Sequence, residues 1–113
     1  MGNNIINLKK TGNSFMSCLG EINGSGFLNK IDIKKMSISP KFITIKKSEY
    51  GNAIVKSREF FGEFLIYKVS INDNILRVRT NINNLLNSGD KCFLYINKNS
   101  YYFLYPGAYK EYR

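Results

Sequence analysis

The chain has 113 residues, 43% hydrophobic and 14% aromatic, which suits one domain with a single packed core and argues against disorder. Lysine and arginine total 17 against 8 acidic residues, so the formal net charge is +9. No apolar run approaches the roughly 20 residues that span a membrane, and the N-terminus lacks the pattern of a signal peptide. We therefore expect a cytoplasmic protein.

The positive charge has two interpretations. A polyanionic partner such as nucleic acid would explain it. The basic residues, however, are spread along the chain in pairs such as Lys9-Lys10, Lys34-Lys35 and Lys46-Lys47 rather than gathered in one stripe. Lys, Asn, Ile, Tyr and Phe are all abundant, and AT-rich codons encode these residues. An incidental surface charge therefore explains the same composition.

The first half of the chain predicts short strands separated by turns. Gly12-Asn13 is a turn signal, Gly24-Ser25-Gly26 is typical of a loop, and Pro40 precedes an apolar strand. The apolar residues between Lys30 and Ile38 alternate imperfectly. The clearer strands of this half are expected at residues 4–8, 15–19 and 42–45.

The second half has clearer period-two patterns. Residues 53–57 lead into a Glu-Phe-Phe-Gly-Glu corner at 59–63, and residues 64–71 alternate between an apolar and a mixed face. Asn72-Asp73-Asn74 tolerates positive φ and predicts a hairpin. The elements expected after it are a strand with Leu76 and Val78 inward and Arg77 and Arg79 outward, a turn at 83–87, a turn at Ser88-Gly89-Asp90, a strand with Cys92, Leu94 and Ile96 on one face, and a last strand at 101–105.

This spacing predicts the fold class. About eight or nine short strands follow one another at intervals of ~8 to 12 residues, and helical periodicity is nearly absent. Such a pattern is typical of a small antiparallel barrel or sandwich. We expect an all-β protein, a small antiparallel OB-like barrel, with residues 1–113 forming a single domain.

The sequence offers no motif for catalysis or for a cofactor. It contains no histidine, no phosphate-binding Gly-x-x-x-x-Gly-Lys-Ser/Thr loop and no Gly-x-Ser-x-Gly nucleophile elbow. Cys18 and Cys92 lack the spacing of a zinc site or a redox pair, so we expect two reduced, mostly buried thiols. We expect that this chain is not an enzyme and that it binds no metal or cofactor.

Glu59 and Glu63 flank the Phe60-Phe61-Gly62 segment. Carboxylates four residues apart would share one face of a helix, but Gly62 and the surrounding β pattern argue against a helix. We expect Gly62 to permit a bend, one of the two phenylalanines to fill the core, and both acids to lie at the rim. Contact with a partner and acid–base catalysis are the alternatives.

Aromatic and basic residues are interleaved in the last strands. Single-stranded nucleic acids bind where bases stack on exposed rings and cations meet phosphates. Tyrosine is also a normal strand residue, so packing in the core or at its rim explains the same pattern. The candidates for stacking and phosphate contact are Tyr95, Tyr101, Tyr102 and Tyr105 with Lys91, Lys98, Arg77 and Arg79.

The order of motifs from residue 53 to 107 resembles the TOBE-type C-terminal accessory domain of the ATP-binding subunits of ABC importers. In that family a strand enters a Phe-Leu-Gly-Glu-like corner, continues through a tyrosine-bearing strand and a hairpin, and reaches a Gly-Asp turn before the last strands. The Ile38-Ser39-Pro40-Lys41-Phe42-Ile43 segment is similar to the family's Arg-Pro-Glu element in its proline and the apolar residues that follow, whereas Ser39 and Lys41 depart from it. The matching positions here are Glu59, Phe60, Phe61, Gly62, Glu63, Tyr67, Val69, Leu76, Arg77, Val78, Gly89, Asp90, Phe93, Leu94 and residues 104–107.

The resemblance implies a non-catalytic regulatory or dimerisation domain, here without its ATPase domain. Its expected partners are an ABC ATPase domain, a second copy of itself, and a small-molecule or oxyanion ligand. It would approach the inner face of the plasma membrane only through the transporter complex. The alternatives are a basic OB-like nucleic-acid-binding module and a small-ligand sensor. The residues expected to carry partner contacts or architecture are Glu59, Phe60, Gly62, Glu63, Gly89 and Asp90.

Overall fold

The computed structural model describes residues 2–12, 14–23, 33–97 and 101–104. In these ranges the chain forms eleven β-strands and one short 3-10 helix, η2 (Pro40–Phe42). The strands pair antiparallel throughout, so the predicted all-β class is confirmed. None of the helical structure in the described part of the chain is long and apolar enough to cross a membrane.

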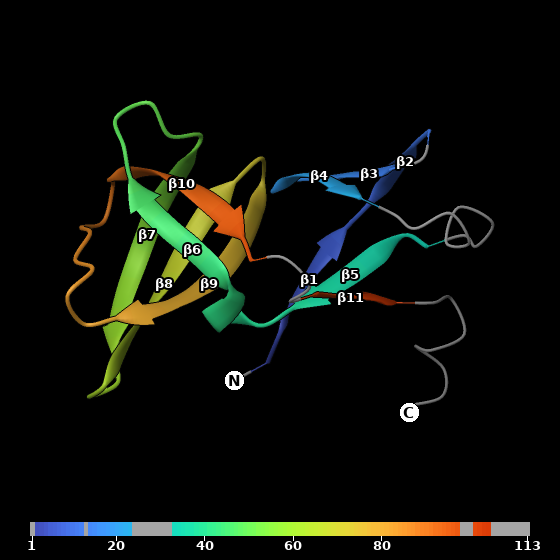
Figure 1. The fold of residues 1–113 in the computed structure, drawn as a ribbon. Coiled ribbons are helices and arrows are strands. Elements are labelled where there is room, and N and C mark those ends of the chain that lie inside the picture. The colour runs from blue at the N-terminus through green and yellow to red at the C-terminus, as the bar shows by residue number, and fades with distance from the viewer. Residues whose placement is uncertain (1, 13, 24–32, 98–100, 105–113) are drawn as a thin grey trace.

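The largest element is a five-stranded sheet, on the left of Figure 1. The chain segment 53–81 forms three neighbouring strands joined by two hairpins, and the strand after it returns to the opposite edge of this group. In spatial order the strands are β6 (Ile43–Lys47), β10 (Lys91–Ile96), β7 (Ala53–Phe60), β8 (Phe64–Ile71) and β9 (Asn74–Asn81).

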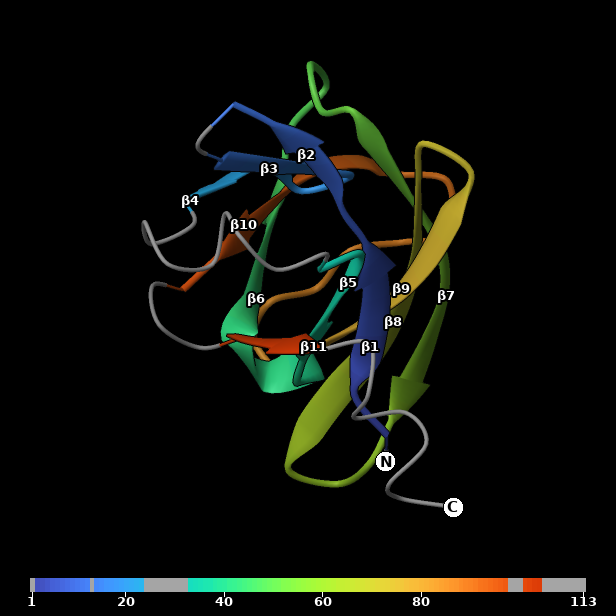
Figure 2. The same cartoon turned by 90° about the vertical axis from the view of Figure 1, so that its right-hand side faces the viewer.

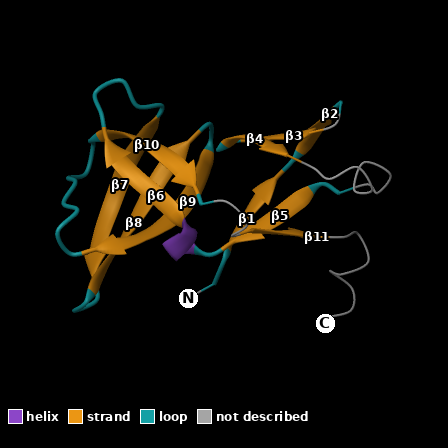
Figure 3. Cartoon of the chain, in the orientation of Figure 1, coloured by secondary structure: helices purple, strands orange, loops and turns teal. Residues whose placement is uncertain are grey.

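Two smaller sheets of three strands each lie on the other side of the molecule (Figures 1 and 3). One joins strands from the start, middle and end of the chain, and the other is a meander of three consecutive strands. The first contains β1 (Asn4–Asn7), β5 (Lys35–Ile38) and β11 (Tyr101–Leu104), and the second contains β2 (Lys9–Thr11), β3 (Ser14–Ser17) and β4 (Gly20–Asn23).

The alternation predicted for β8 and β9 is confirmed. Leu65, Tyr67, Val69 and Ile71 are buried, as are Leu76 and Val78 of β9, while the arginines of β9 are exposed. The connecting residues Asn72 and Asp73 have φ angles of 45° and 64°. Positive φ at both central residues is the geometry of a tight type I′ hairpin, which Asn and Asp tolerate.

Side chains from all three sheets meet in one cluster of buried residues. Tyr67 and Phe15 are its largest fully buried members, and Met36 of β5 and Val78 of β9 are also fully buried. In the view turned by 90°, the small sheets lie in front of the large one (Figure 2). The cluster therefore links the two sides of the molecule rather than dividing into separate cores.

None of the sheets formed by the described residues is closed into a barrel. The five-stranded sheet ends at β6 and β9, and no hydrogen-bonded ladder joins these two edges. The edges are bridged by one side chain: Asn84 Nδ2 donates to the Ile45 carbonyl oxygen at 3.2 Å and to Thr80 Oγ1 at 3.2 Å. The strand count also exceeds the predicted eight or nine, because polar strands such as β2 carry no apolar alternation.

The open edge of β9 is covered by a side chain from β1. Asn4 Nδ2 donates to the Arg77 carbonyl oxygen at 2.8 Å, and the Arg77 N–H donates to Asn4 Oδ1 at 2.9 Å. The Asn4 amide thus occupies the place of a neighbouring strand. These two bonds satisfy the edge groups of Arg77 and join the small sheet to the large one.

Candidate functional site

The Glu-Phe-Phe-Gly-Glu corner is the end of β7 and the hairpin to β8. Glu59 and Phe60 are the last residues of β7, and the Phe61 N–H donates to the Phe64 carbonyl oxygen at 2.9 Å. Gly62 has a φ of 87°, and a Cβ placed there would meet no atom within 4 Å. The glycine is therefore required by the backbone conformation and not by lack of space.

The prediction that Phe60 or Phe61 fills the core is wrong. Phe60 is 66% exposed and Phe61 is 47% exposed. The reason is the length of the β7–β8 ladder, which continues to the pair of Phe60 with Leu65 at the margin of the buried cluster. Glu59 and Glu63 are exposed as well. The corner thus presents its side chains to solvent.

Phe61 and Phe64 form one wall of a pocket on the outer face of the large sheet. Their ring centroids lie 5.4 Å apart with an angle of 13° between the planes, so the rings stack. The guanidinium carbon of Arg79 lies 3.8 Å from the Phe64 ring centroid. The pocket has a volume of about 610 Å³, and we call it the Phe64 pocket. Its lining residues are Ser39, Pro40, Lys41, Phe61, Phe64 and Arg79.

The opposite wall of this pocket is η2. Pro40 opens this helical turn, where its fixed φ is favourable and its missing N–H costs nothing. The Phe42 N–H donates to the Ser39 carbonyl oxygen at 3.0 Å and closes the turn. Lys41 is exposed at the middle of the turn, with its Nζ atom 5.1 Å from the Phe42 ring centroid. A short, locked turn therefore brings a lysine to the pocket.

Cations continue from this pocket along β8 and β9. Arg77 precedes Arg79 by two residues on the same face of β9, and Lys68 of β8 lies opposite Arg77. Lys68 and Arg77 line an adjoining cleft of about 300 Å³, whose other wall includes Asn3 and Asn4. Within the described ranges, no carboxylate forms an ion pair with Lys68, Arg77 or Arg79.

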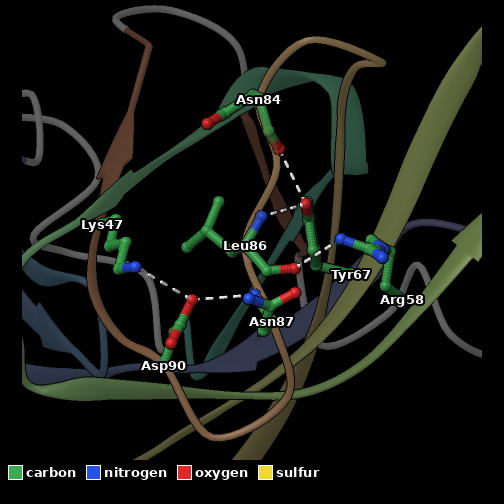
Figure 4. Close-up of polar contacts among 7 residues, drawn as sticks. All are labelled: Lys47, Arg58, Tyr67, Asn84, Leu86, Asn87 and Asp90. Carbon is green, nitrogen blue, oxygen red and sulfur yellow. Dashed lines mark hydrogen bonds and ion pairs between the residues drawn. The ribbon is translucent and has the colours of Figure 1, made fainter.

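A polar network fixes the segment between β9 and β10 to the large sheet (Figure 4). The Tyr67 hydroxyl donates to the Asn84 carbonyl oxygen at 2.7 Å and accepts from the Leu86 N–H at 2.7 Å. Arg58 Nη1 donates to the Leu86 carbonyl oxygen at 2.9 Å. Tyr67 and Leu86 are buried, so these bonds lie out of water, where their loss is most expensive.

The Gly89-Asp90 turn joins this network to the strands. The Gly89 N–H donates to the Val55 carbonyl oxygen at 2.8 Å, and the Val55 N–H donates to the Asp90 carbonyl oxygen at 2.9 Å. The Asp90 carboxylate accepts from the Asn87 N–H at 2.8 Å and lies 3.5 Å from Lys47 Nζ. The Asn87 N–H, followed by Lys47, lowers the pKa of Asp90 below its ordinary value. These contacts are internal to the fold.

The tyrosines and arginines predicted to form one binding surface are not brought together. Tyr95 is 50% exposed and lines, with Tyr101, a cleft of about 540 Å³ beside Glu21 of β4, and none of the described basic side chains lines that cleft. Tyr102 is 71% exposed on β11. The arginines lie on β9, whereas Tyr95 lies on β10, and β7 and β8 lie between these two strands in the sheet. Tyr105 and Lys98 lie outside the described residues, as does the Gly24-Ser25-Gly26 segment.

Both cysteines are free thiols. Cys92 is completely buried, and this burial, with a smaller effect of Asp90, raises its pKa to about 11. Cys18 is half-buried, and burial raises its pKa as well. In the described part of the chain no cluster of three or more Cys, Asp or Glu side chains is arranged to hold a metal ion.

The sequence matches no protein-family model, and it matches no curated protein. The resemblance of residues 53–107 to an accessory domain therefore stays a prediction.

The Phe64 pocket was not predicted from the sequence. Phe61 and Phe64 were expected to be elements of a corner and a strand, and Lys41 was noted only where the family's motif differs. A signal was present in the sequence: two aromatics separated by a turn, with an outward-facing arginine expected on the next strand.

Proposed function

We propose that this chain is a non-catalytic accessory domain of the ATP-binding subunit of an ABC importer and that it acts through protein contacts. The observation that carries the proposal is the exposure of large apolar side chains at one end of the five-stranded sheet. Phe60, Ile82 and Leu85 are 66%, 42% and 64% exposed. We call these three residues the apolar end.

The strand register explains why these side chains share one end of the sheet. Phe60 lies opposite Leu65, which in turn lies opposite Thr80 at the end of β9. Ile82 follows Thr80 by two residues, and Leu85 belongs to the same connecting segment. Arg58, two residues before Phe60, holds that segment through its bond to Leu86.

The apolar end suits a contact with another protein because its scaffold is rigid. The Tyr67 and Arg58 hydrogen bonds hold the segment around Leu85, so little order has to be gained on binding. Burying one Phe or Leu side chain contributes about 1.5 to 3 kcal/mol. The occupants that fit are the ATPase domain of the same subunit and a second copy of this chain.

The proposal includes the finer architecture that the resemblance implies, an OB-like arrangement of the five-stranded sheet. Support comes from Asn84, whose side chain joins β6 to β9 and brings the two edges of the sheet together. Replacing Asn84 with Ala should therefore loosen the β6 edge. Amide hydrogen exchange at residues 43–47 measures this loosening, and unchanged protection there would remove the arrangement from the proposal.

Co-purification tests the partner. The tagged chain, expressed in the organism that encodes it, is expected to retain an ABC ATP-binding subunit identified by mass spectrometry. The Phe60→Ser variant should lose that subunit. Tyr50→Ser is the matched control, because Tyr50 is 81% exposed in the loop between β6 and β7, at the other end of β7. If neither the wild-type chain nor the Tyr50→Ser control retains an ATP-binding subunit, the proposal is overturned.

A further inference from the structure

The exposed aromatic pair of the Phe64 pocket is a stacking platform. Phe61 and Phe64 are nearly parallel, and Phe61 leaves about half of its surface to solvent. A ring held in this way by a second ring loses little freedom when a flat ligand covers it. Nucleic-acid bases stack on such platforms in proteins that bind single strands.

Arg79 supplies an oriented cation beside this platform. Its guanidinium carbon lies 3.8 Å from the Phe64 ring centroid, so the side chain is held against the ring. No hydrogen bond or ion pair within the described ranges occupies its N–H groups. A guanidinium packed on a ring keeps its donors for a phosphate, which it binds through two parallel hydrogen bonds.

The cations extend beyond the pocket. Lys41 of η2 faces it from the opposite wall, and Arg77 and Lys68 continue the positive surface into the adjoining cleft. Residues two apart on a strand are about 6.6 to 6.8 Å apart. The cations therefore form a row and not a single point, which suits a chain of phosphates better than one small anion.

Two carboxylates lie nearby. Glu59 lies opposite Ile66 on the β7 side of the face, and Glu63 belongs to the hairpin. The four cations Lys41, Lys68, Arg77 and Arg79 outnumber these two carboxylates, and the net charge of the chain is +9. An acidic peptide would use the cations but not the stacked rings, so the combination favours a nucleotide.

We propose that the Phe64 pocket binds one nucleotide of a single-stranded nucleic acid, with the base stacked on Phe61 and its phosphate held by Arg79 and Lys41. The next phosphates contact Arg77 and Lys68. This activity is separate from the contacts of the apolar end, because Phe60 does not line the pocket.

Fluorescence anisotropy with a labelled oligothymidylate tests the proposal, using the full chain at low salt. Phe61→Ser should weaken binding by about 5- to 150-fold, the effect of losing one stacked base. Phe60→Ser is the control for an exposed phenylalanine outside the pocket. Arg79→Gln should weaken binding as well, and Lys46→Gln is its charge-matched control on β6. Unfolding temperatures show whether each variant is folded.

Salt and ligand arms complete the test. Raising salt from about 50 to 200 mM should weaken oligonucleotide binding steeply. Absence of binding at low salt, or equal losses in the pocket variants and their controls, would overturn the proposal. Free AMP or UMP binding as tightly as the oligonucleotide would overturn the single-strand assignment in favour of a free nucleotide. Polyglutamate competing equally well would assign the face to acidic peptides instead. Loss of partner contact in Phe60→Ser with oligonucleotide binding retained separates this site from the apolar end.

Discussion

The segment from residue 82 to 90, which connects β9 to β10, and the hairpin from residue 61 to 63, which connects β7 to β8, are built in opposite ways. The first is held to the large sheet by the buried Tyr67 hydroxyl and the Arg58 guanidinium, and internally by the Asp90 carboxylate, which accepts from the Asn87 N–H. The hairpin has one backbone hydrogen bond of its own and exposed side chains.

This difference separates architecture from recognition. Both regions carry residues that motif reasoning selected, with Gly89 and Asp90 in the first and Phe60 and Gly62 in or beside the second. The contacts of Asp90 end within the fold, so its side chain has little to offer a partner. Much of the Phe60 side chain is exposed, so it can contact a partner. A shared motif therefore does not imply a shared role.

The largest loss of stability is expected at Gly51, in the loop between β6 and β7. A Cβ at Gly51 would overlap with the carbonyl group of Cys92, which is backbone and cannot move aside. Gly51→Ala should lower the free energy of unfolding by about 3 kcal/mol. Chemical denaturation measures it. A loss no larger than that of Gly62→Ala would show that β10 can shift.

Removing the buried hydroxyl gives the next largest effect. Tyr67→Phe deletes the acceptor of the Leu86 N–H and the donor to the Asn84 carbonyl oxygen. The unfolding free energy should fall by about 2 kcal/mol, because a buried N–H is left without a partner. Denaturant titration checks the value, and amide exchange at Leu86 should speed up. An unchanged free energy of unfolding would mean that the network does not fix the segment between β9 and β10.

In the hairpin, substitution of glycine should cost less. Gly62 has open space around it but a φ of 87°, so Gly62→Ala introduces backbone strain without a clash. A loss of about 1 kcal/mol is expected, and Gly62→Val should lose about 1 to 3 kcal/mol because its branched side chain tolerates this conformation less well. Thermal unfolding distinguishes the two. An unchanged unfolding temperature of the valine variant would contradict the assignment of a bend at Gly62.

A smaller effect is expected from Asp90, and it depends on pH. The folded state lowers the pKa of this carboxyl, so its stabilising contribution is present above the ordinary pKa near 4 and is lost as the pH falls through the folded value. Asp90→Asn should therefore flatten the stability profile below about pH 4 and lower the stability slightly, by a constant amount, from about pH 5 to neutrality. Parallel profiles for the two proteins would contradict the contact with the Asn87 N–H.

Cysteine reactivity provides the mildest test. Cys92 is completely buried with a pKa of about 11, whereas Cys18 is partly accessible. Iodoacetamide at pH 8 should label Cys18 first, and mass spectrometry of peptides gives the order. Labelling of Cys92 before Cys18 would mean that β10 opens in the native state.

The sequence was informative where a pattern has one physical solution. The alternation of β8, the Asn72-Asp73 turn and the burial of Cys92 followed directly from side-chain chemistry. The exposure of Phe60 did not, because local alternation cannot tell whether a strand runs past the margin of the core. The extra strands also escaped prediction, since β2 consists of polar residues whose pairing depends on tertiary contacts.

The site was less predictable than the fold. The Phe64 pocket combines η2 with β8 and β9, which are separated by more than twenty residues in the sequence. Only the packing of η2 beside β9 brings Lys41 to Arg79. Likewise, the predicted group of tyrosines and arginines was separated by strand order, because β10 lies across β7 from the hairpin that carries the arginines.

Sedimentation equilibrium of the wild-type chain beside its Phe60→Ser variant tests the central claim most directly, that the exposed apolar end makes protein contacts. Across micromolar to millimolar concentrations, the wild-type chain should form dimers and the variant should stay monomeric, with equal unfolding temperatures because Phe60 contributes little to the core. A variant that dimerises as tightly would contradict the account, as would a wild-type chain that is monomeric throughout and also retains no ATP-binding subunit on co-purification.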